Sequence, residues 1–299
     1  MSSVLVVGAG TMGRGIAGLC AISGHETFVF DADPEAQRGV RTHVESSWAR
    51  AIEKGRIPAD SAETARRRLK VATRLKDAAA VDFAIEAVPE SIDLKVMVFS
   101  ELDDLCPDRT ILASNTSSLS ITRIARSTGR RDRVIGIHFF NPVAAMPLVE
   151  IVAGRETSAQ TQTRALELVE SLGKQPVRVS DTPGFATSRL GVALGLEAMR
   201  MLEEGVADAA DIDRAMELGY GHRMGPLKTS DLVGLDVRLS IAETLASGLD
   251  ADRFRTPRIL TTLVAEGHTG RKSGEGFYRW DGDRAAGPGE RAAALARKR

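Results

Sequence analysis

One six-residue segment, Gly8-Ala-Gly-Thr-Met-Gly13, constrains the fold of this chain more than any other. It directly follows the β-branched run at residues 4–7 and directly precedes a helical pattern that continues to about Ser23. A second strand pattern, over residues 27–30, comes next. A strand, a glycine turn, a helix and a strand within about 30 residues predict a βαβ unit. The crossover helix of such a unit makes its two strands parallel.

The spacing of Gly8, Gly10 and Gly13 is typical of a turn that binds a dinucleotide. The first glycine permits the tight turn, the second lets the backbone approach a pyrophosphate, and the third lets helix and strand pack closely. The start of the following helix offers N–H groups and a partial positive charge to phosphates. Asp31 ends the second strand, 18 residues after Gly13, where a carboxylate accepts hydrogen bonds from the adenine ribose. Since that carboxylate would repel a 2′-phosphate, we expect NAD rather than NADP as the cofactor.

The alternation of strand and helix patterns continues to about residue 180. Further strands are predicted at residues 83–88, 110–114, 134–138, 148–152 and 175–179. After Pro183-Gly184, helical patterns dominate, over residues 185–204, 208–218, 227–247 and 257–266. We therefore predict an α/β protein, with a Rossmann-type, doubly wound and mainly parallel sheet in residues 1–182 and an all-helical domain in residues 183–283. The Ala/Gly/Arg-rich residues 284–299 are predicted to form a flexible tail.

Composition excludes several other classes of protein. Lysine plus arginine and aspartate plus glutamate each number 40, so the chain lacks the global basic excess of a nucleic-acid binder. No apolar run is long enough to span a membrane, and the N-terminus does not resemble a secretory leader, so we expect a cytoplasmic protein. Cys20 and Cys106 have no metal-ligand spacing, and we expect no metal site. A neutral chain can still carry a local basic patch for an anionic ligand.

The best candidate for proton transfer is His138, which ends a predicted strand. Sites in open α/β sheets form outside the carboxyl ends of the strands. Glu150 follows 12 residues later inside an apolar run, where a carboxylate is costly unless it is paired. Pairing with His138 would orient the imidazole and stabilise its charged form, whereas the alternative is a strand-edge glutamate that faces water. The polar segment Ser114–Ser118 also follows a strand, and either a substrate cradle or a loop with a helix cap explains it.

Taken together, the chain's motifs closely resemble the L-3-hydroxyacyl-CoA dehydrogenase family, including the bacterial 3-hydroxybutyryl-CoA dehydrogenases. The resemblance extends over about residues 4 to 280. The segments that carry it are Gly8-Ala-Gly-Thr-Met-Gly-Arg-Gly-Ile-Ala17, Ile85-Glu-Ala-Val-Pro-Glu90, Ala113-Ser-Asn-Thr-Ser-Ser-Leu119, His138-Phe-Phe-Asn-Pro142, Leu148-Val-Glu150, Asp181-Thr-Pro-Gly-Phe185, Gly225-Pro-Leu227, Asp231-Leu-Val-Gly-Leu-Asp236 and Gly274-Glu-Gly-Phe-Tyr278.

The resemblance implies reversible, NAD-dependent oxidation of a 3-hydroxyacyl-CoA to the 3-ketoacyl-CoA, a reaction of fatty-acid metabolism. It implies that His138 is the general base, that Glu150 orients it, and that Ser117 hydrogen-bonds the reacting oxygen. It also implies a homodimer whose helical domain closes over the acyl-CoA substrate. With the glycine turn and Asp31, the implied cofactor site comprises Gly8, Gly10, Thr11, Met12, Gly13, Asp31, Glu90, Lys95, Asn115, Asn141 and Lys272, and the implied CoA contacts are Ser47 and Lys54.

One departure from the family pattern concerns the substrate. Family members commonly read Gly-Phe-x-x-Asn-Arg where this chain reads Gly184-Phe-Ala-Thr-Ser-Arg189, so Ser188 replaces the amide that helps polarise the substrate carbonyl. A serine hydroxyl donates one hydrogen bond with a shorter reach. Two alternatives therefore stay open: a related dehydrogenase of a free hydroxy compound such as L-gulonate or carnitine, and a noncatalytic NAD-binding structural protein. The length of the acyl chain, and whether it ends in a second carboxylate, also stay open.

Overall fold

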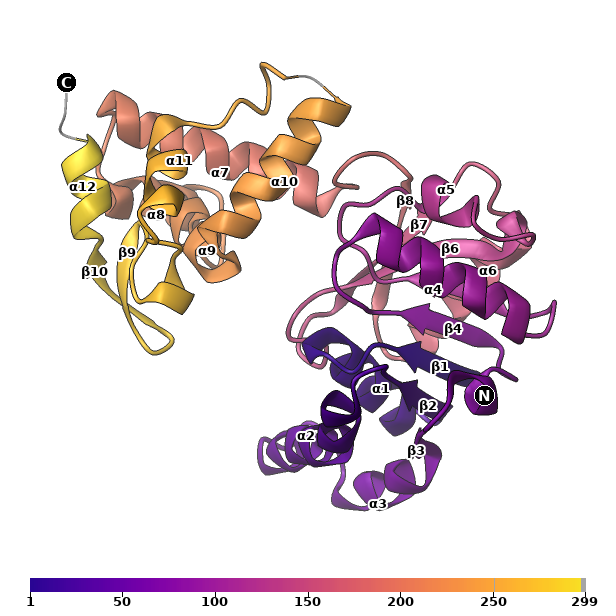
Figure 1. Cartoon of the computed structure of the whole chain (residues 1–299). Helices are drawn as coiled ribbons and strands as arrows, with labels where there is room; N and C mark the ends of the chain where they lie inside the picture. Colours follow the sequence, from indigo (N-terminus) through magenta and orange to yellow (C-terminus); the bar gives the residue numbers. More distant parts are fainter. Residues whose placement is uncertain (250, 297–299) are drawn as a thin grey trace. The chain divides into compact units, whose positions relative to one another are not determined.

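The computed structural model describes residues 1–249 and 251–296, which form two compact units (Figure 1). Unit 1 runs from Met1 to Thr182, and unit 2 begins at Pro183. None of the described helices combines the length and the apolar character needed to cross a membrane.

Unit 1 is built on one eight-stranded sheet with the order β3-β2-β1-β4-β5-β6-β7-β8. The first six strands are parallel, β7 is antiparallel to β6, and β8 is parallel to β7. The doubly wound, mainly parallel sheet predicted from the sequence is thereby confirmed. The strands are β1 (Ser3–Val7), β2 (Glu26–Phe30), β3 (Leu69–Val71), β4 (Phe83–Glu86), β5 (Ile111–Ser114), β6 (Val134–Phe139), β7 (Leu148–Ala153) and β8 (Gln175–Ser180).

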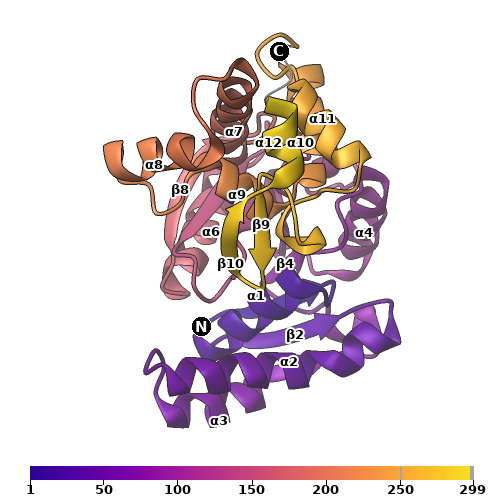
Figure 2. The ribbon, with the colours of Figure 1, turned by 90° about the vertical axis from the view of Figure 1, so that its left-hand side faces the viewer.

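Helices cover the sheet of unit 1 (Figures 1 and 2). They are α1 (Thr11–Ile22), α2 (Pro34–Glu53), α3 (Ala59–Arg68), α4 (Ile92–Leu105), α5 (Ile121–Ala125) and α6 (Ala159–Ser171). The long helix α2 begins with Pro34, and the side chain of Asp33 caps it by accepting a hydrogen bond from the Glu35 N–H. Its buried residues Val40, Val44 and Trp48 recur every four positions. This stripe packs into the core that joins α1, α3 and α6 to alternate residues of the strands.

Unit 2 is mainly helical and has its own apolar core. Its helices are α7 (Thr187–Glu204), α8 (Ala209–Gly219), α9 (Pro226–Val233), α10 (Leu235–Gly248), α11 (Arg258–Ala265) and α12 (Glu290–Ala296). Sequence periodicity predicted one helix over residues 227–247, but the structure has two, α9 and α10. They are separated at Gly234, whose φ of +106° is incompatible with a continuous right-handed helix.

The prediction of a flexible tail over residues 284–299 is wrong for the part that the structure describes. Residues 284–288 form β10, which pairs with β9 (Tyr278–Asp281) in an antiparallel ribbon, and α12 follows with Ala292 only 1% exposed. Figure 2 shows this ribbon and α12 together in yellow. The composition of the segment is that of a tail, but strand pairing and burial of a small residue order it. Residues 297–299 lie outside the described residues.

Asp231 fixes the start of this ribbon from α9. Its buried carboxylate accepts hydrogen bonds from the backbone N–H groups of Phe277 and Tyr278 and from the indole N–H of Trp280, at 2.8 to 2.9 Å. A buried carboxylate with three donors is satisfied without a cationic partner. The C-terminal ribbon is thereby held to the helices of unit 2.

Candidate functional site

Three neighbouring strands of unit 1 deliver polar side chains to the same edge of the sheet. The order β4-β5-β6 and the parallel register place Glu86 opposite Ser114, and Ser114 opposite Gly136, two residues before His138. Glu90 and the segment Thr116–Ser118 lie in the loops that follow β4 and β5. The carboxyl ends of these strands therefore form one polar surface at the position where ligands of open α/β sheets bind.

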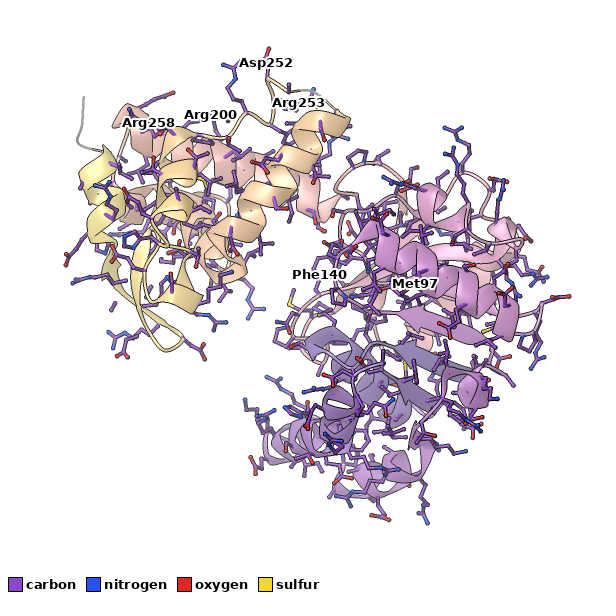
Figure 3. All side chains as sticks on the ribbon, in the orientation of Figure 1. Met97, Phe140, Arg200, Asp252, Arg253 and Arg258 are labelled. Atoms are coloured by element: carbon purple, nitrogen blue, oxygen red, sulfur yellow. The ribbon has the colours of Figure 1, made fainter. Side chains whose placement is uncertain are left out.

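His138 and Glu150 face each other across the antiparallel pair β6–β7. The distance between the His138 Nδ1 and the Glu150 Oε2 is 2.8 Å. His138 is 7% exposed and Glu150 is fully buried, so little water competes for this bond. The ring of Phe140, which is labelled in Figure 3, lies beside the imidazole with 4.4 Å between the ring centroids. The carboxylate and the aromatic neighbour together fix the orientation of the imidazole.

A second buried carboxylate, Glu86, lies at the end of β4. One of its oxygens accepts hydrogen bonds from the Lys95 ammonium (2.6 Å) and the Val88 N–H (2.7 Å), and the other accepts one from the Ser114 hydroxyl (2.6 Å). Glu86 and Lys95 are each at most 1% exposed. Removing either partner would leave a charge without compensation in the interior. This ion pair holds α4 against the ends of β4 and β5.

Lys95 also reaches Glu90, with 3.3 Å between the ammonium and a carboxylate oxygen. Glu90 in turn accepts hydrogen bonds from the Thr116 hydroxyl (2.6 Å) and from the Ser117 N–H (3.0 Å) and hydroxyl (3.3 Å). Burial raises the pKa of Glu90, but the ammonium and these hydrogen bonds outweigh burial and hold that pKa below its ordinary value. Glu90, Lys95 and Ser117, predicted separately from the sequence, therefore lie in one connected network. Lys95 is buried inside it, which suits a positioning residue better than a direct contact to a ligand.

Asn115 joins the same edge of the sheet to β6. Its side-chain oxygen accepts a hydrogen bond from the backbone N–H of Phe139 at 2.9 Å. The backbone N–H of Asn115 donates to the backbone carbonyl of Glu86. The amide thus fixes the loop after β5 directly beside His138.

The glycine turn has the geometry that a dinucleotide phosphate requires. Gly8 has a φ of +105°, and a Cβ on Gly13 would lie 1.8 Å from the Gly8 carbonyl oxygen, so neither position accepts a larger residue. A Cβ on Gly10 would meet nothing within 4 Å, which leaves an open cradle above the turn. No side chain caps the start of α1, whose first residues are Thr11 and Met12. The N–H groups of this helix start are therefore available to an anion, and the turn fits the pyrophosphate of NAD.

Asp31 lies at the end of β2, next to this turn. Its carboxylate accepts hydrogen bonds from the backbone N–H groups of Ala9 and Asp33. A carboxylate has about four acceptor positions, so two such bonds leave capacity for ribose hydroxyls. The Asp31 side chain is thus oriented by the backbone that it adjoins, at the place the sequence predicted.

A cavity of about 640 Å³ lies between α1, α2 and the loop after β6. Ser47 and Lys54, the two predicted CoA contacts, line it together with Asn141. Four further basic side chains line the same cavity: Arg14, His43, Arg50 and Arg56. No aspartate or glutamate is among the described residues that line it. The cavity is therefore electropositive, although the whole chain has no net charge.

Two predicted site residues belong to unit 2. Ser188 is the second residue of α7, and Lys272 lies in a short 3₁₀ turn where its ammonium pairs with Asp236 at 2.6 Å. Among the described residues, no cluster of three or more histidine, cysteine, aspartate or glutamate side chains is arranged to hold a metal ion.

Sequence reasoning missed Glu86 and the arginines of the cavity. Glu86 carried a usable signal, because it interrupts a buried strand in the same way as Glu150. Arg14 and Arg50 carried none, because an arginine on a helix most often lies on a solvated face.

Comparisons with known proteins bear on the family and the fold of this chain. Residues 3–182 match the family model described as 3-hydroxyacyl-CoA dehydrogenase, NAD binding domain, and residues 184–280 match 3-hydroxyacyl-CoA dehydrogenase, C-terminal domain. A probable 3-hydroxybutyryl-CoA dehydrogenase of Bacillus subtilis is 42% identical over 281 residues, which cover 94% of this chain and 98% of that protein. The 3-hydroxyadipyl-CoA dehydrogenase of Escherichia coli is 39% identical over 96% of this chain and 60% of that protein. The crystal structure of (S)-3-hydroxybutyryl-CoA dehydrogenase from Ralstonia eutropha has a TM-score of 0.90 at 40% identity, covering 93% of this chain and 99% of that one.

Proposed function

This chain belongs to the 3-hydroxyacyl-CoA dehydrogenase family of NAD-dependent enzymes, and we propose that it oxidises an (S)-3-hydroxyacyl-CoA reversibly, with His138 and Glu150 as a general base pair. The His138–Glu150 hydrogen bond of 2.8 Å in a nearly dry environment carries the catalytic part of the proposal. When bound, NAD supplies the acceptor for the two electrons that leave C3 of the substrate.

The side chains of unit 1 supply the rest of the chemistry. His138 takes the proton of the 3-hydroxyl group at its Nε2, because Nδ1 is directed at Glu150. The Glu150 carboxylate stabilises the imidazolium that results and holds the ring in place. Glu90 holds the backbone N–H of Ser117, and in our proposal the Ser117 hydroxyl turns its single proton from Glu90 to the reacting oxygen. Because oxidation needs neutral His138 and reduction needs its charged form, the oxidation rate is expected to rise with pH while the reduction rate falls.

The electropositive cavity favours an acyl-CoA substrate over a free hydroxy acid. A small acid such as L-gulonate, or the zwitterion carnitine, has no need of a cavity of about 640 Å³ lined by several basic side chains. The phosphates of CoA carry several negative charges and match such a lining. Carnitine in particular carries a quaternary ammonium that this lining would repel.

The test is an NADH-consumption assay with acetoacetyl-CoA, and NAD reduction with L-gulonate and carnitine. We expect activity with the CoA thioester alone. Replacing Lys54 by methionine should raise KM for acetoacetyl-CoA about 5-fold or more while kcat changes less, since Lys54 contacts a part of the substrate remote from the reaction. Lys70→Met, which removes an exposed lysine elsewhere in unit 1, is the matched control. Activity with a free hydroxy compound and none with the thioester would refute the proposal.

A further inference from the structure

An arginine occupies a core position in the helical stripe of α10. The buried residues of that helix are Leu235, Arg238, Ala242 and Leu245, at the spacing of one helix face. Arg238 is 8% exposed, only slightly more than the core residues of unit 2, which are each at most 6% exposed. A guanidinium is rarely buried to this extent unless an anion or several acceptors surround it.

Among the described residues, the Arg238 side chain forms no hydrogen bond and no ion pair. Its Nε is fully shielded from solvent and has no hydrogen-bond partner within the described chain. Burial lowers the pKa of Arg238 to about 10, and no neighbouring charge opposes that effect. An uncompensated buried cation is strongly unfavourable, so this guanidinium has the character of an anion-binding group.

The guanidinium of Arg238 lies against α7 at Gly191, a position without a side chain. A Cβ placed on Gly191 would lie 3.3 Å from one terminal nitrogen of Arg238 and 3.9 Å from the other. The absence of a side chain at Gly191 therefore gives the guanidinium its space. Ser188 precedes Gly191 by one helical turn, and residues three apart lie on the same helix face with about 5–6 Å between their Cβ positions. Both Ser188 and Gly191 are partly exposed, so a ligand can reach this face of α7.

We propose that Arg238 binds the terminal carboxylate of a dicarboxylic 3-hydroxyacyl-CoA. This inference rests on the proposed function and on the position beside the substrate carbonyl that the family resemblance implies for Ser188. An acyl chain that starts beside Ser188 has only one helical turn to cross before it reaches Arg238, which a short carbon chain spans. A carboxylate at its end would make the charge-assisted, two-pronged contact for which a guanidinium is shaped. A methyl group there would leave the buried cation without a partner.

The experiment compares two 3-ketoacyl-CoA substrates of equal chain length, 3-oxoadipyl-CoA, which ends in a carboxylate, and 3-oxohexanoyl-CoA, which ends in a methyl group. The readout is the ratio of their kcat/KM values with the full-length protein and NADH. We expect this ratio to be at least about 10 in the unmodified protein, since a site built for a charged group rejects the analogue that lacks it. Arg238→Met should lower the ratio about 100-fold, and Arg238→Lys should restore part of it. Arg214→Met, which removes an exposed arginine on α8, serves as the matched control.

The two levels of the proposal fail in different ways. A ratio near or below 1 in the unmodified protein overturns the role of Arg238, even if Arg238→Met does not fold. An equal loss of kcat/KM for both substrates in a folded Arg238→Met protein also overturns it, because a structural role predicts that result. Activity with acetoacetyl-CoA but with neither six-carbon substrate overturns the role of Arg238, and absence of activity with all three thioesters refutes the proposed function itself.

Discussion

Replacing Lys95 by methionine removes the ammonium from the buried cluster at the end of β4 and leaves its carboxylate partners behind, the buried Glu86 and the partly exposed Glu90. Lys95 and Glu86 are 1% and 0% exposed, and the distance between their charged groups is 2.6 Å. The methionine side chain nearly preserves the volume of lysine, so an empty cavity contributes little to the loss of stability. The perturbation is therefore almost purely electrostatic.

The expected magnitude follows from what Glu86 retains. It still accepts hydrogen bonds from the Val88 N–H and the Ser114 hydroxyl, but its negative charge has no compensation in the interior. Breaking a buried ion pair from one side costs about 3–5 kcal/mol in the free energy of unfolding. The double variant Glu86→Gln/Lys95→Met removes both charges and should be more stable than Lys95→Met by at least about 1 kcal/mol.

Urea unfolding followed by tryptophan fluorescence measures this effect. The chain has two tryptophans, Trp48 in unit 1 and Trp280 in unit 2. Trp48 is 5% exposed and packs against α1, so its emission reports on the unfolding of unit 1. A Trp280→Phe background, applied to every variant, leaves Trp48 as the single emitter.

Lys70→Met is the control for this prediction. Lys70 pairs with Glu26, and both side chains are half exposed, so this variant should cost less than about 1 kcal/mol. If Lys95→Met is no more destabilising than Lys70→Met, the reasoning about buried charge is refuted. A double variant that is less stable than Lys95→Met would refute it as well.

Three further predictions concern the polar edge of unit 1. Glu150→Gln should lower kcat about 100-fold to 10,000-fold while the Kd for NADH changes little, because the amide cannot stabilise the His138 imidazolium; a loss of less than about 10-fold in steady-state assays would contradict the base pair. Asp31→Ser should weaken NADH binding about 10-fold or more and narrow the preference over NADPH, as measured by fluorescence titration; an unchanged Kd for NADH would remove Asp31 from the cofactor site. The pKa of Glu90 is held below its ordinary value in the folded protein, so Glu90 stabilises the fold above about pH 4.5, and this contribution disappears as the pH falls through the lowered pKa. Glu90→Gln should therefore flatten the loss of stability between about pH 5 and pH 3 in urea titrations, and an unchanged slope would show that Glu90 does not contribute.

Much of the fold could be predicted because its signals are local. The β-branched runs, the glycine turn and the proline that starts α2 each act through neighbouring residues, and the predicted elements agree with the structure there. The strand β3 was missed because it has only three residues, Leu69–Val71, with an exposed lysine in the middle, and its ladder with β2 is its main support. The tail was mispredicted for a similar reason, since β10 is held by its pairing with β9 and not by its own composition.

The same contrast between local signals and long-range contacts applies to the candidate site. His138 and Glu150 could be singled out because polar residues in apolar strands need partners, whatever the rest of the fold is. The basic lining of the cavity could not be predicted, because it collects side chains from α1, α2 and the turn after α2, which come together only in three dimensions. Arg238 is the extreme case. In the sequence it is an ordinary helical arginine. Its burial depends on its contact with Gly191 of another helix, which only the structure shows.

The reversal of direction between β6 and β7 has a consequence for how this chemistry is inherited. Because β7 returns beside β6, the histidine and its carboxylate lie within one continuous stretch, residues 134–153. When two related proteins exchange gene segments and the crossover lies outside this stretch, both residues come from the same parent. The spacing of the pair is set by the register of two adjacent strands and not by a distant loop. Domains recombined at other points, in evolution or in the laboratory, would therefore keep the hydrogen-bonded histidine and glutamate together while other parts of the chain change.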